Sequence, residues 1–332
     1  MTLQNSTVVI MGASSGIGHG TAVAFAKEGA NVVLASRNEG TLKDVAKECE
    51  KFGAKTLVVE TDVTDADSVL ELANKAAKAF NGRIDVWVND AGVGAIGNYE
   101  IVPMDTHAQV VAVNLLGYMH GTHAVLPYFK NQRSGTIINM NSLGAYMPSP
   151  YAASYTASKF GLRGFMDAVR AEFREWPDIH ICDLFPGFVG SPGMQHGANY
   201  VGVEMKPMPP VVSPYTVAEE IVHLAKNPRN KQLLGFTARI AKIVGNLAPA
   251  MSANSLARVM EYHFEHGKKA PINDGNLFSP TPASTSQIEG SYNHFKRNTL
   301  IAGGVCAVAA GAFIAWKLNQ PVQPTLSDRQ LQ

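Results

Sequence analysis

The chain has 332 residues, of which 46% are hydrophobic and 17% are charged. This length and hydrophobic content exclude a small disulfide scaffold and a wholly disordered chain, because they allow a large core. Lys plus Arg number 28 against 27 Asp plus Glu, a net charge of +1, so we expect no nucleic-acid partner. Cys49, Cys182 and Cys306 are far apart, which predicts no metal site and suits a reducing compartment.

From residue 7 to about residue 235, short β-branched runs alternate with longer amphipathic stretches. This alternation predicts βαβ units and a parallel sheet covered by helices on both faces. The expected strands are residues 7–11, 31–35, 56–60, 84–89, 136–140, 179–185 and 232–235. The stretches with the clearest helical periodicity are residues 16–28, 65–80 and 154–176.

Two amphipathic helices, residues 238–247 and 255–266, are expected after the last strand. Ile240, Ile243, Val244 and Leu247 form one stripe of the first helix. We expect these helices to cover the core, with a membrane-surface role as the alternative. They complete a catalytic domain of residues 1–270. Residues 271–298 are rich in Pro, Ser, Thr and Gly over much of their length and are predicted to form a flexible linker.

Residues 299–316 form a run of 18 residues without a charge, between Lys296 and Arg297 on one side and Lys317 on the other. As a helix the run would measure about 27 Å, enough to cross the hydrocarbon core of a bilayer once. A soluble tail helix or a segment docked on the core is the alternative. The basic flanks favour a catalytic domain on the cytoplasmic side, followed by a short polar tail of residues 317–332.

A glycine turn follows the first strand directly and precedes the first helix. Without side chains, such a turn lets backbone N–H groups approach a pyrophosphate at the start of the helix. The residues expected to bind it are Gly12, Ser14, Ser15, Gly16, Ile17 and Gly18. The position between strand and helix makes this a nucleotide-binding turn.

The second strand ends at Ser36 and Arg37, where an NAD site would place an acidic residue on the ribose hydroxyls. A serine and an arginine can instead hold a 2′-phosphate, so the sequence favours NADP(H). Asp62, followed by Val63, is placed to accept a hydrogen bond from the adenine amino group. A helix cap is the alternative role for this aspartate.

Tyr155 and Lys159 lie four residues apart on a predicted helix, so their side chains share a face. A nearby ammonium is expected to lower the pKa of the phenol, which then acts as a proton donor at neutral pH. Ser142 follows a predicted strand and can donate a hydrogen bond to a substrate carbonyl oxygen. Taken alone, a Tyr-xxx-Lys spacing is more often structural.

Together, these motifs resemble the short-chain dehydrogenase/reductase family over about residues 5–240. Gly12, Gly16 and Gly18 match its glycine motif, and Asn114, Ser142, Tyr155 and Lys159 match its catalytic residues. The resemblance implies a Rossmann-like, doubly wound α/β fold with a seven-stranded parallel sheet, to which this chain adds C-terminal helices and a hydrophobic tail. It also implies further cofactor-binding positions at Asp90, Ala91, Gly92, Pro186, Gly187, Val189 and Ser191.

Four positions depart from the family pattern. Met11 stands where a Thr is usual, Asp90 replaces an Asn that braces neighbouring strands, and Ser191 replaces a Thr. Ser15 stands where one NADP-preferring subgroup has a basic residue. The NADP(H) preference therefore depends mainly on Arg37.

The resemblance implies interconversion of a carbonyl and a secondary alcohol. Tyr155 would pass the proton, Ser142 would orient the oxygen, Lys159 would bind the ribose and tune the phenol, and Asn114 would hold a water linked to the lysine. It further implies a homo-oligomer. We expect reduction as the usual direction, with a catalytically silent NADP(H)-binding sensor or scaffold as the alternative.

The resemblance implies that the segment from Pro186 to Ser191 contacts the nicotinamide end of the cofactor. A lid over the substrate is expected just after it, between residues 193 and 212. An apolar and adaptable pocket would favour an apolar ketone or aldehyde. Ser142 and Tyr155 would contact the substrate together with Met194 and Tyr200. The other residues expected to line the pocket are Val203, Met205 and Met208.

Overall fold

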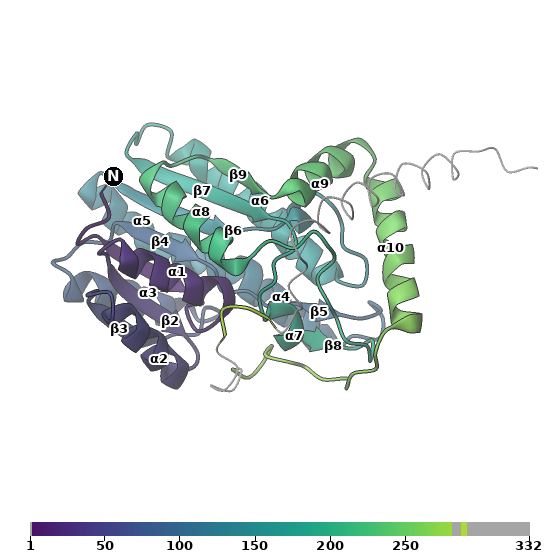
Figure 1. Ribbon diagram of the computed structural model, residues 1–332. Helices are drawn as coiled ribbons and strands as arrows, with labels where there is room; N and C mark the ends of the chain where they lie inside the picture. Colours follow the sequence, from purple (N-terminus) through teal and green to yellow (C-terminus); the bar gives the residue numbers. More distant parts are fainter. Residues whose placement is uncertain (1, 281–286, 291–332) are drawn as a thin grey trace, which may run out of the picture. The chain divides into compact units, whose positions relative to one another are not determined.

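The computed structural model describes residues 2–280 and 287–290, all of which fall in one compact unit, Met1–Asn293 (Figure 1). Seven parallel strands form the main sheet in the order β3-β2-β1-β4-β6-β7-β9. Their bounds are β1 Thr7–Met11, β2 Asn31–Ser36, β3 Thr56–Glu60, β4 Val86–Asn89, β6 Gly135–Met140, β7 Ile179–Pro186 and β9 Lys231–Leu234. All seven predicted strands are thus present, with ends displaced by at most two residues, and the predicted fold class is confirmed.

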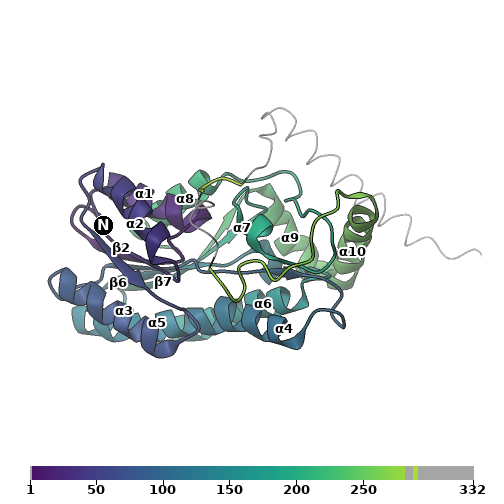
Figure 2. The same ribbon diagram turned by 90° about the horizontal axis from the view of Figure 1, so that it is seen from below.

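Helices cover both faces of the sheet (Figure 2). One layer contains α1 Gly16–Lys27, α2 Glu39–Glu50 and α8 Pro214–Lys226. The other contains α3 Ala66–Ala79, α4 Met104–Val111, α5 Gly117–Gln132 and α6 Ala153–Glu172. The two layers follow from right-handed βαβ crossovers on either side of the first strand.

The central strands are buried on both faces because each face has its own core. In β1, Val9 and Met11 belong to the core beneath α3, α5 and α6, while Val8 and Ile10 belong to the core beneath α1, α2 and α8. Successive side chains of a strand point to opposite faces, so an uninterrupted apolar run serves both cores. Met11 itself is fully buried, and this departure from the family pattern therefore fills core volume.

A short polar ladder crosses the centre of the sheet. The Trp87 indole N–H donates to Asn89 Oδ1 at 2.8 Å, and Asn89 Nδ2 donates to Asn139 Oδ1 at 2.8 Å. All three side chains are fully buried, and buried polar groups need such partners. Asn89 on β4 therefore braces β6 directly, one residue before Asp90.

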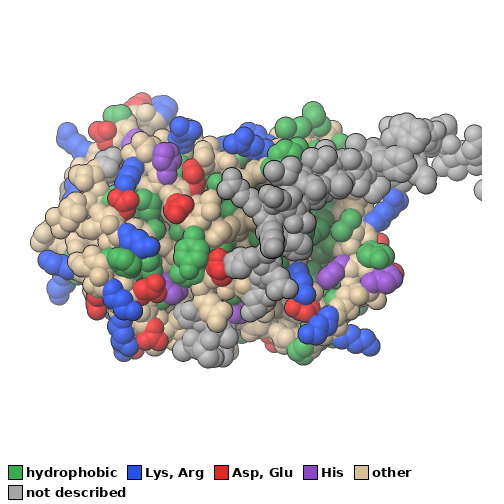
Figure 3. All heavy atoms as spheres, in the orientation of Figure 1, with side chains coloured by type: hydrophobic (Ala, Val, Ile, Leu, Met, Phe, Trp, Pro, Cys, Tyr) green, Lys and Arg blue, Asp and Glu red, His purple; other side chains and the backbone are tan. Residues whose placement is uncertain are grey.

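The C-terminal helices are α9 Phe236–Leu247 and α10 Pro249–His266, both longer at their N-terminal ends than predicted. Ala238, Ala241 and Gly245 are buried in α9, and Ile240 and Val244 are half-buried. Ile243 and Leu247, expected on the covered stripe, are 55% and 81% exposed. The helix therefore covers the core as expected, but with only part of its apolar stripe, and apolar side chains gather on the surface near it (Figure 3).

The segment after α10 packs on the domain at residues 271–280 and 287–290, where the sequence predicts a free linker. Leu277 is fully buried and Ile288 is 9% exposed. Asn199 and Asn273 exchange two backbone hydrogen bonds, and the Ala270 N–H donates to the Gly202 oxygen. The segment packs with few apolar residues because backbone hydrogen bonds supply its other contacts. Amino-acid composition does not reveal such bonds.

The apolar run of residues 299–316 and the polar tail lie outside the described residues. Within the part of the chain that the structure describes, no helix is long and apolar enough to cross a membrane.

Candidate active site

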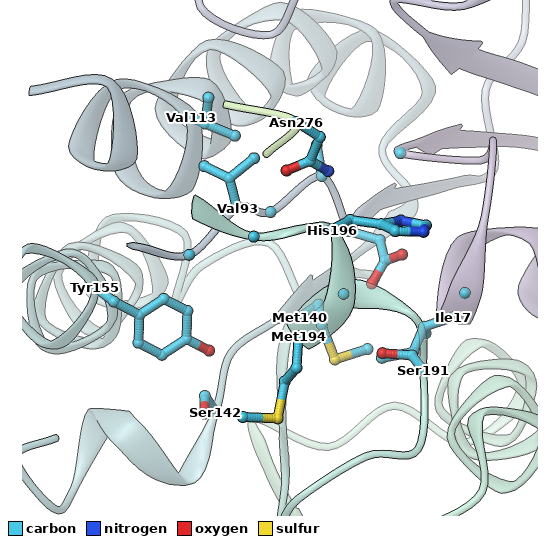
Figure 4. Close-up of a pocket in the computed structure, with 18 of the residues that line it drawn as sticks. Ile17, Val93, Val113, Met140, Ser142, Tyr155, Ser191, Met194, His196 and Asn276 are labelled. Atoms are coloured by element: carbon cyan, nitrogen blue, oxygen red, sulfur yellow. The ribbon is translucent and has the colours of Figure 1, made fainter. Parts of the chain in front are cut away.

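A cavity of about 430 Å³ opens at the carboxyl edge of the main sheet (Figure 4). At this edge the chain leaves β1 towards β2 on one side of the sheet and leaves β4 towards β6 on the other. In open α/β sheets this topological switch point is the usual ligand site. Every residue that the sequence assigned to the cofactor lines the cavity except Gly18. The carboxyl ends of parallel strands meet at one edge, so residues far apart in the sequence converge here.

The glycine turn is built from close backbone contacts. Gly12 has a φ of +98°, and a Cβ at this position would lie 2.6 Å from the Ala91 nitrogen. A Cβ at Gly18 would lie 2.2 Å from the Gly12 oxygen. Gly18 therefore lies behind the lining and lets the turn close, and its backbone N–H donates to the Asp90 carboxylate.

Asp90 joins the glycine turn to the loop after β4. Its backbone N–H donates to the Met11 oxygen at 3.0 Å, and its carboxylate accepts from Gly18. Burial raises the pKa of Asp90 to about 8, although the Lys159 ammonium and the Gly18 N–H both act to lower it. The strand-bracing role expected of this family position is taken by Asn89, and Asp90 braces the turn instead.

Tyr155 and Ser142 are neighbours in the cavity (Figure 4). Burial raises the pKa of Tyr155, and a hydrogen bond with the Ser142 side chain lowers it. The sequence predicts a phenol pKa lowered by Lys159, whereas burial outweighs the lowering influence here. Tyr155 is therefore protonated at neutral pH, which is the form that donates a proton.

Lys159 follows Tyr155 by four residues on α6 and is 4% exposed. Its Nζ donates to the Met140 oxygen at 2.9 Å and lies 5.8 Å from the centre of the Tyr155 ring. Burial lowers the pKa of Lys159 to about 8, while the Asp90 and Asp183 carboxylates act to raise it. The ammonium is thus placed to act on groups in the cavity without a bond to the phenol.

Asn114 is fully buried in a π-helical turn, Ala112–Leu116, between α4 and α5. Its side chain accepts from the Val93 N–H at 2.9 Å and donates to the Val93 oxygen at 2.8 Å. Asn114 does not line the cavity, but Val93 does. Asn114 is therefore a positioning residue that holds the loop after β4 in place. Single π-turns within α-helices are frequent at functional sites.

Arg37 and Asp62 lie at the ends of β2 and β3, with Ser36 and Val63 beside them in the lining. Arg37 donates through one Nη to the Leu277 oxygen at 3.1 Å and through the other to the Asn276 oxygen at 2.5 Å. Asp62 Oδ1 accepts from the Thr64 N–H at 2.9 Å, so it stabilises a turn, while the N-cap of α3 is Asp65.

The lid is partly as predicted. Met194 and Met205 line the cavity, whereas Tyr200, Val203 and Met208 do not. The Tyr200 hydroxyl bonds to Thr106 at 2.8 Å and to Asp274, and Val203 forms a β-bridge with Lys269. Tyr200, predicted to contact the substrate, is thus not part of the cavity lining, and its hydroxyl fastens the segment after α10.

The sequence patterns do not single out every residue of the lining. Among those missed, His196 comes from the lid, Leu256 from α10, and Asn276 and Pro280 from the presumed linker. Burial lowers the pKa of His196, so this imidazole is neutral at pH 7. No motif marks these residues in the sequence, and only the path of the chain after α10 brings Asn276 to the cavity.

The residues present fit a nicotinamide dinucleotide. The turn has the close backbone packing that a pyrophosphate site requires, α1 begins within it, and Arg37 follows β2 where a ribose phosphate would lie. The glycine turn and Arg37 would hold the phosphates, and Lys159 with Tyr155 would lie at the reactive end.

Known proteins share this arrangement. A family model described as short chain dehydrogenase matches residues 6–199. The uncharacterized oxidoreductase YxnA of Bacillus subtilis is 30% identical over 270 residues, covering 80% of this chain and 75% of that protein. The 3-oxoacyl-acyl-carrier-protein reductase FabG of Thermotoga maritima is 32% identical over 230 residues, covering 68% of this chain and 93% of that protein.

A solved structure of an alcohol dehydrogenase from Thermococcus sibiricus, complexed with 5-hydroxy-NADP, superposes with a TM-score of 0.61 and 29% identity. The match covers 70% of this chain and 96% of that one. This chain belongs to the short-chain dehydrogenase family and is an oxidoreductase.

The raised pKa of Asp90 predicts a pH-dependent stability. The Asp90 carboxyl has an ordinary pKa of 3.8, which applies to the unfolded chain, and a pKa of about 8 in the folded protein. Between these two pH values the carboxyl is ionised in the unfolded chain and protonated in the folded one. The Asp90 contribution to stability is therefore full below pH 3.8 and is lost as the pH rises towards 8. The Asp90→Asn variant lacks this loss.

We expect the melting temperature of Asp90→Asn, relative to wild type, to be higher at about pH 8.5 than at about pH 5, by about 2–4 °C for each 1 kcal/mol. Thermal melts of both proteins at the two pH values measure this difference. Asp44→Asn, which changes an exposed carboxyl, is the control. A difference that does not change with pH would show that Asp90 is ionised throughout.

Proposed function

We propose that this oxidoreductase uses NADP(H) to reduce an apolar ketone or aldehyde to an alcohol. The observation that carries the proposal is one cavity with Tyr155 and Ser142 at one part of its lining and Arg37 at another. A bound NADPH supplies the hydride. The remaining chemistry is orientation of the carbonyl and delivery of one proton, which the chain's own side chains provide.

Tyr155 holds the proton, because burial keeps its phenol protonated at neutral pH. Ser142 bonds to the phenol and can donate to the same carbonyl oxygen, so the two hydroxyls fix the oxygen. Lys159 adds a positive charge beneath them, which favours the phenolate that remains after proton transfer.

Arg37 supports the preference for NADP(H). No carboxylate stands at Ser36 or Arg37, where binding of the ribose hydroxyls of NAD would require one. A guanidinium pairs strongly with a phosphate. The alcohol dehydrogenase of Thermococcus sibiricus, whose structure contains 5-hydroxy-NADP, supports the same choice.

Apolar side chains surround Ser142 and Tyr155 on the substrate side. Figure 4 places Met194 beside Ser142. Leu143, Phe188, Met205 and Leu256 also line the cavity. Methionines adapt to irregular ligands, and a cavity of this composition favours an apolar carbonyl compound.

Tyr155→Phe tests the chemical role of the phenol. Without the hydroxyl the proton has no donor, so we expect kcat for ketone or aldehyde reduction to fall by about 100-fold or more. The Kd for NADPH, measured by fluorescence titration, should stay close to that of wild type. Tyr128→Phe is the matched control, because that hydroxyl donates to Asn74 on the surface, away from the cavity. Wild-type protein that binds NADPH but reduces no class of carbonyl would favour the sensor or scaffold.

Arg37→Asp tests the cofactor. Wild type is expected to bind NADPH at least about tenfold more tightly than NADH, and the variant should reverse or abolish this preference. Parallel fluorescence titrations with both nucleotides measure it, with Arg239→Asp on exposed α9 as the control. An unchanged preference in Arg37→Asp would place the 2′-phosphate elsewhere.

We further propose that residues 299–316 anchor the protein in a membrane once, with the catalytic domain on the cytoplasmic side, and that the chain forms a homo-oligomer. The uncharged run and its basic flanks support the anchor, and family resemblance supports the oligomer.

The anchor is tested by membrane retention of the full chain. Ala307→Arg places a charge in the middle of the run, at a cost of about 2.5–3.5 kcal/mol. We expect wild type to stay with membranes after alkaline carbonate washing and Ala307→Arg to be released. Ala283→Arg is the control. Equal release of wild type and Ala307→Arg would exclude the anchor.

A further inference from the structure

The chain after α10 returns across the domain to the cofactor end of the cavity. This C-terminal strap, defined as residues 268–280 with 287–290, appears along the lower edge of the ribbon in Figure 1. The Asn276 N–H donates to the His196 oxygen at 2.8 Å, and the Gly290 N–H donates to the Gly190 oxygen at 2.8 Å. The strap is thus fastened to the lid and to the segment that contacts the nicotinamide.

Leu277 anchors the middle of the strap. Its side chain is fully buried in the core beneath α3, α5 and α6. Its oxygen accepts from Gln109 Nε2 at 3.3 Å as well as from Arg37. Burial of a leucine side chain is favourable, and the apolar contacts around Leu277 fix the backbone at this position.

The strap orients Arg37 without using all of its hydrogen-bond donors. A guanidinium has five N–H donors in a fixed plane. The two bonds to the Asn276 and Leu277 oxygens use one donor on each Nη. The other donors remain for an anion, and two fixed carbonyls hold the plane that presents them.

Asn276 presents an unpartnered polar atom beside Arg37. Its Oδ1 is buried and has no hydrogen-bond partner among the described residues. The residue lines the same cavity as Val93 and Val113, and Figure 4 labels all three. An unpaired buried acceptor is unfavourable, and a ligand hydroxyl or amino group would supply the missing hydrogen bond.

We propose that the C-terminal strap completes the adenosine half of the cofactor site: the Asn276 carboxamide bonds to the adenosine, and the backbone oxygens of Asn276 and Leu277 position Arg37 for the 2′-phosphate. This inference rests on the proposed use of NADP(H). The strap makes the preference for a 2′-phosphate depend on residues about 240 positions away from Arg37 in the sequence.

Leu277 positions the strap, whereas Asn276 contacts the adenosine. Substitutions of the two residues should therefore change the Kd values for NADPH and NADH in different ways. Loss of a contact to adenosine weakens NADPH and NADH alike, because both contain adenosine. Loss of the Leu277 anchor disorders the oxygens that orient Arg37, and only the 2′-phosphate of NADPH depends on that orientation.

The test is fluorescence titration of the full chain with NADPH and with NADH, for wild type, Asn276→Ala and Leu277→Ala. We expect Asn276→Ala to raise both Kd values by about three- to tenfold. Leu277→Ala should raise the Kd for NADPH more than that for NADH, again by about three- to tenfold in their ratio. The controls are Ser279→Ala and Ile272→Ala, which change exposed strap residues.

Tighter NADPH binding in Leu277→Ala would overturn the positioning role, because the strap oxygens would then compete with the phosphate. Unchanged Kd values in Asn276→Ala would overturn the contact to the adenosine. Because Asn276 is only half-buried, we expect this variant to fold even if Leu277→Ala does not, and the test then rests on it. If wild type prefers NADPH and Arg37→Asp abolishes the preference while the strap variants bind as wild type, only the strap inference fails. A wild type without preference contradicts the cofactor proposal itself.

Discussion

The site depends on the parallel arrangement of the seven strands, which brings all their carboxyl ends to one edge. Gly12 follows β1, Arg37 follows β2, Asp90 follows β4 and Ser142 lies just after β6. The switch in strand order between β1 and β4 separates the loops there and leaves room for a ligand. The two cores that hold β1 and its neighbours rigid therefore also fix the geometry of the cavity.

Burial sets the electrostatics of the reactive end. It raises the pKa of Tyr155 and of Asp90 and lowers that of Lys159, all in the direction that disfavours charge. The attraction between Asp90 and Lys159 opposes burial, because it lowers the pKa of the Asp90 carboxyl and raises that of the Lys159 ammonium. The result is a phenol that keeps its proton and a lysine whose charge is sensitive to what the cavity contains.

The sheet and the catalytic residues could be predicted because their signals are local. A β-branched run, a glycine turn and a Tyr-xxx-Lys spacing each depend on residues a few positions apart. The strap could not be predicted, since the Pro- and Ser-rich composition of its segment resembles a linker and its contacts are mainly backbone hydrogen bonds. The position of Tyr200 outside the lining could not be predicted for the same reason, since one of its two hydroxyl partners, Asp274, belongs to that segment.

Two details of chemistry also required three dimensions. The strand-bracing role passes from Asp90 to Asn89, which only the register of β4 against β6 reveals. The pKa of Tyr155 depends on burial that no spacing encodes.

The most direct measurement is a crystal structure of the full chain with NADP⁺. The account predicts the pyrophosphate at the glycine turn, the 2′-phosphate on Arg37 with the strap oxygens still bound to the guanidinium, and the nicotinamide ring facing Tyr155. A nucleotide bound away from Arg37, or a strap displaced from the site by the phosphate, would contradict it.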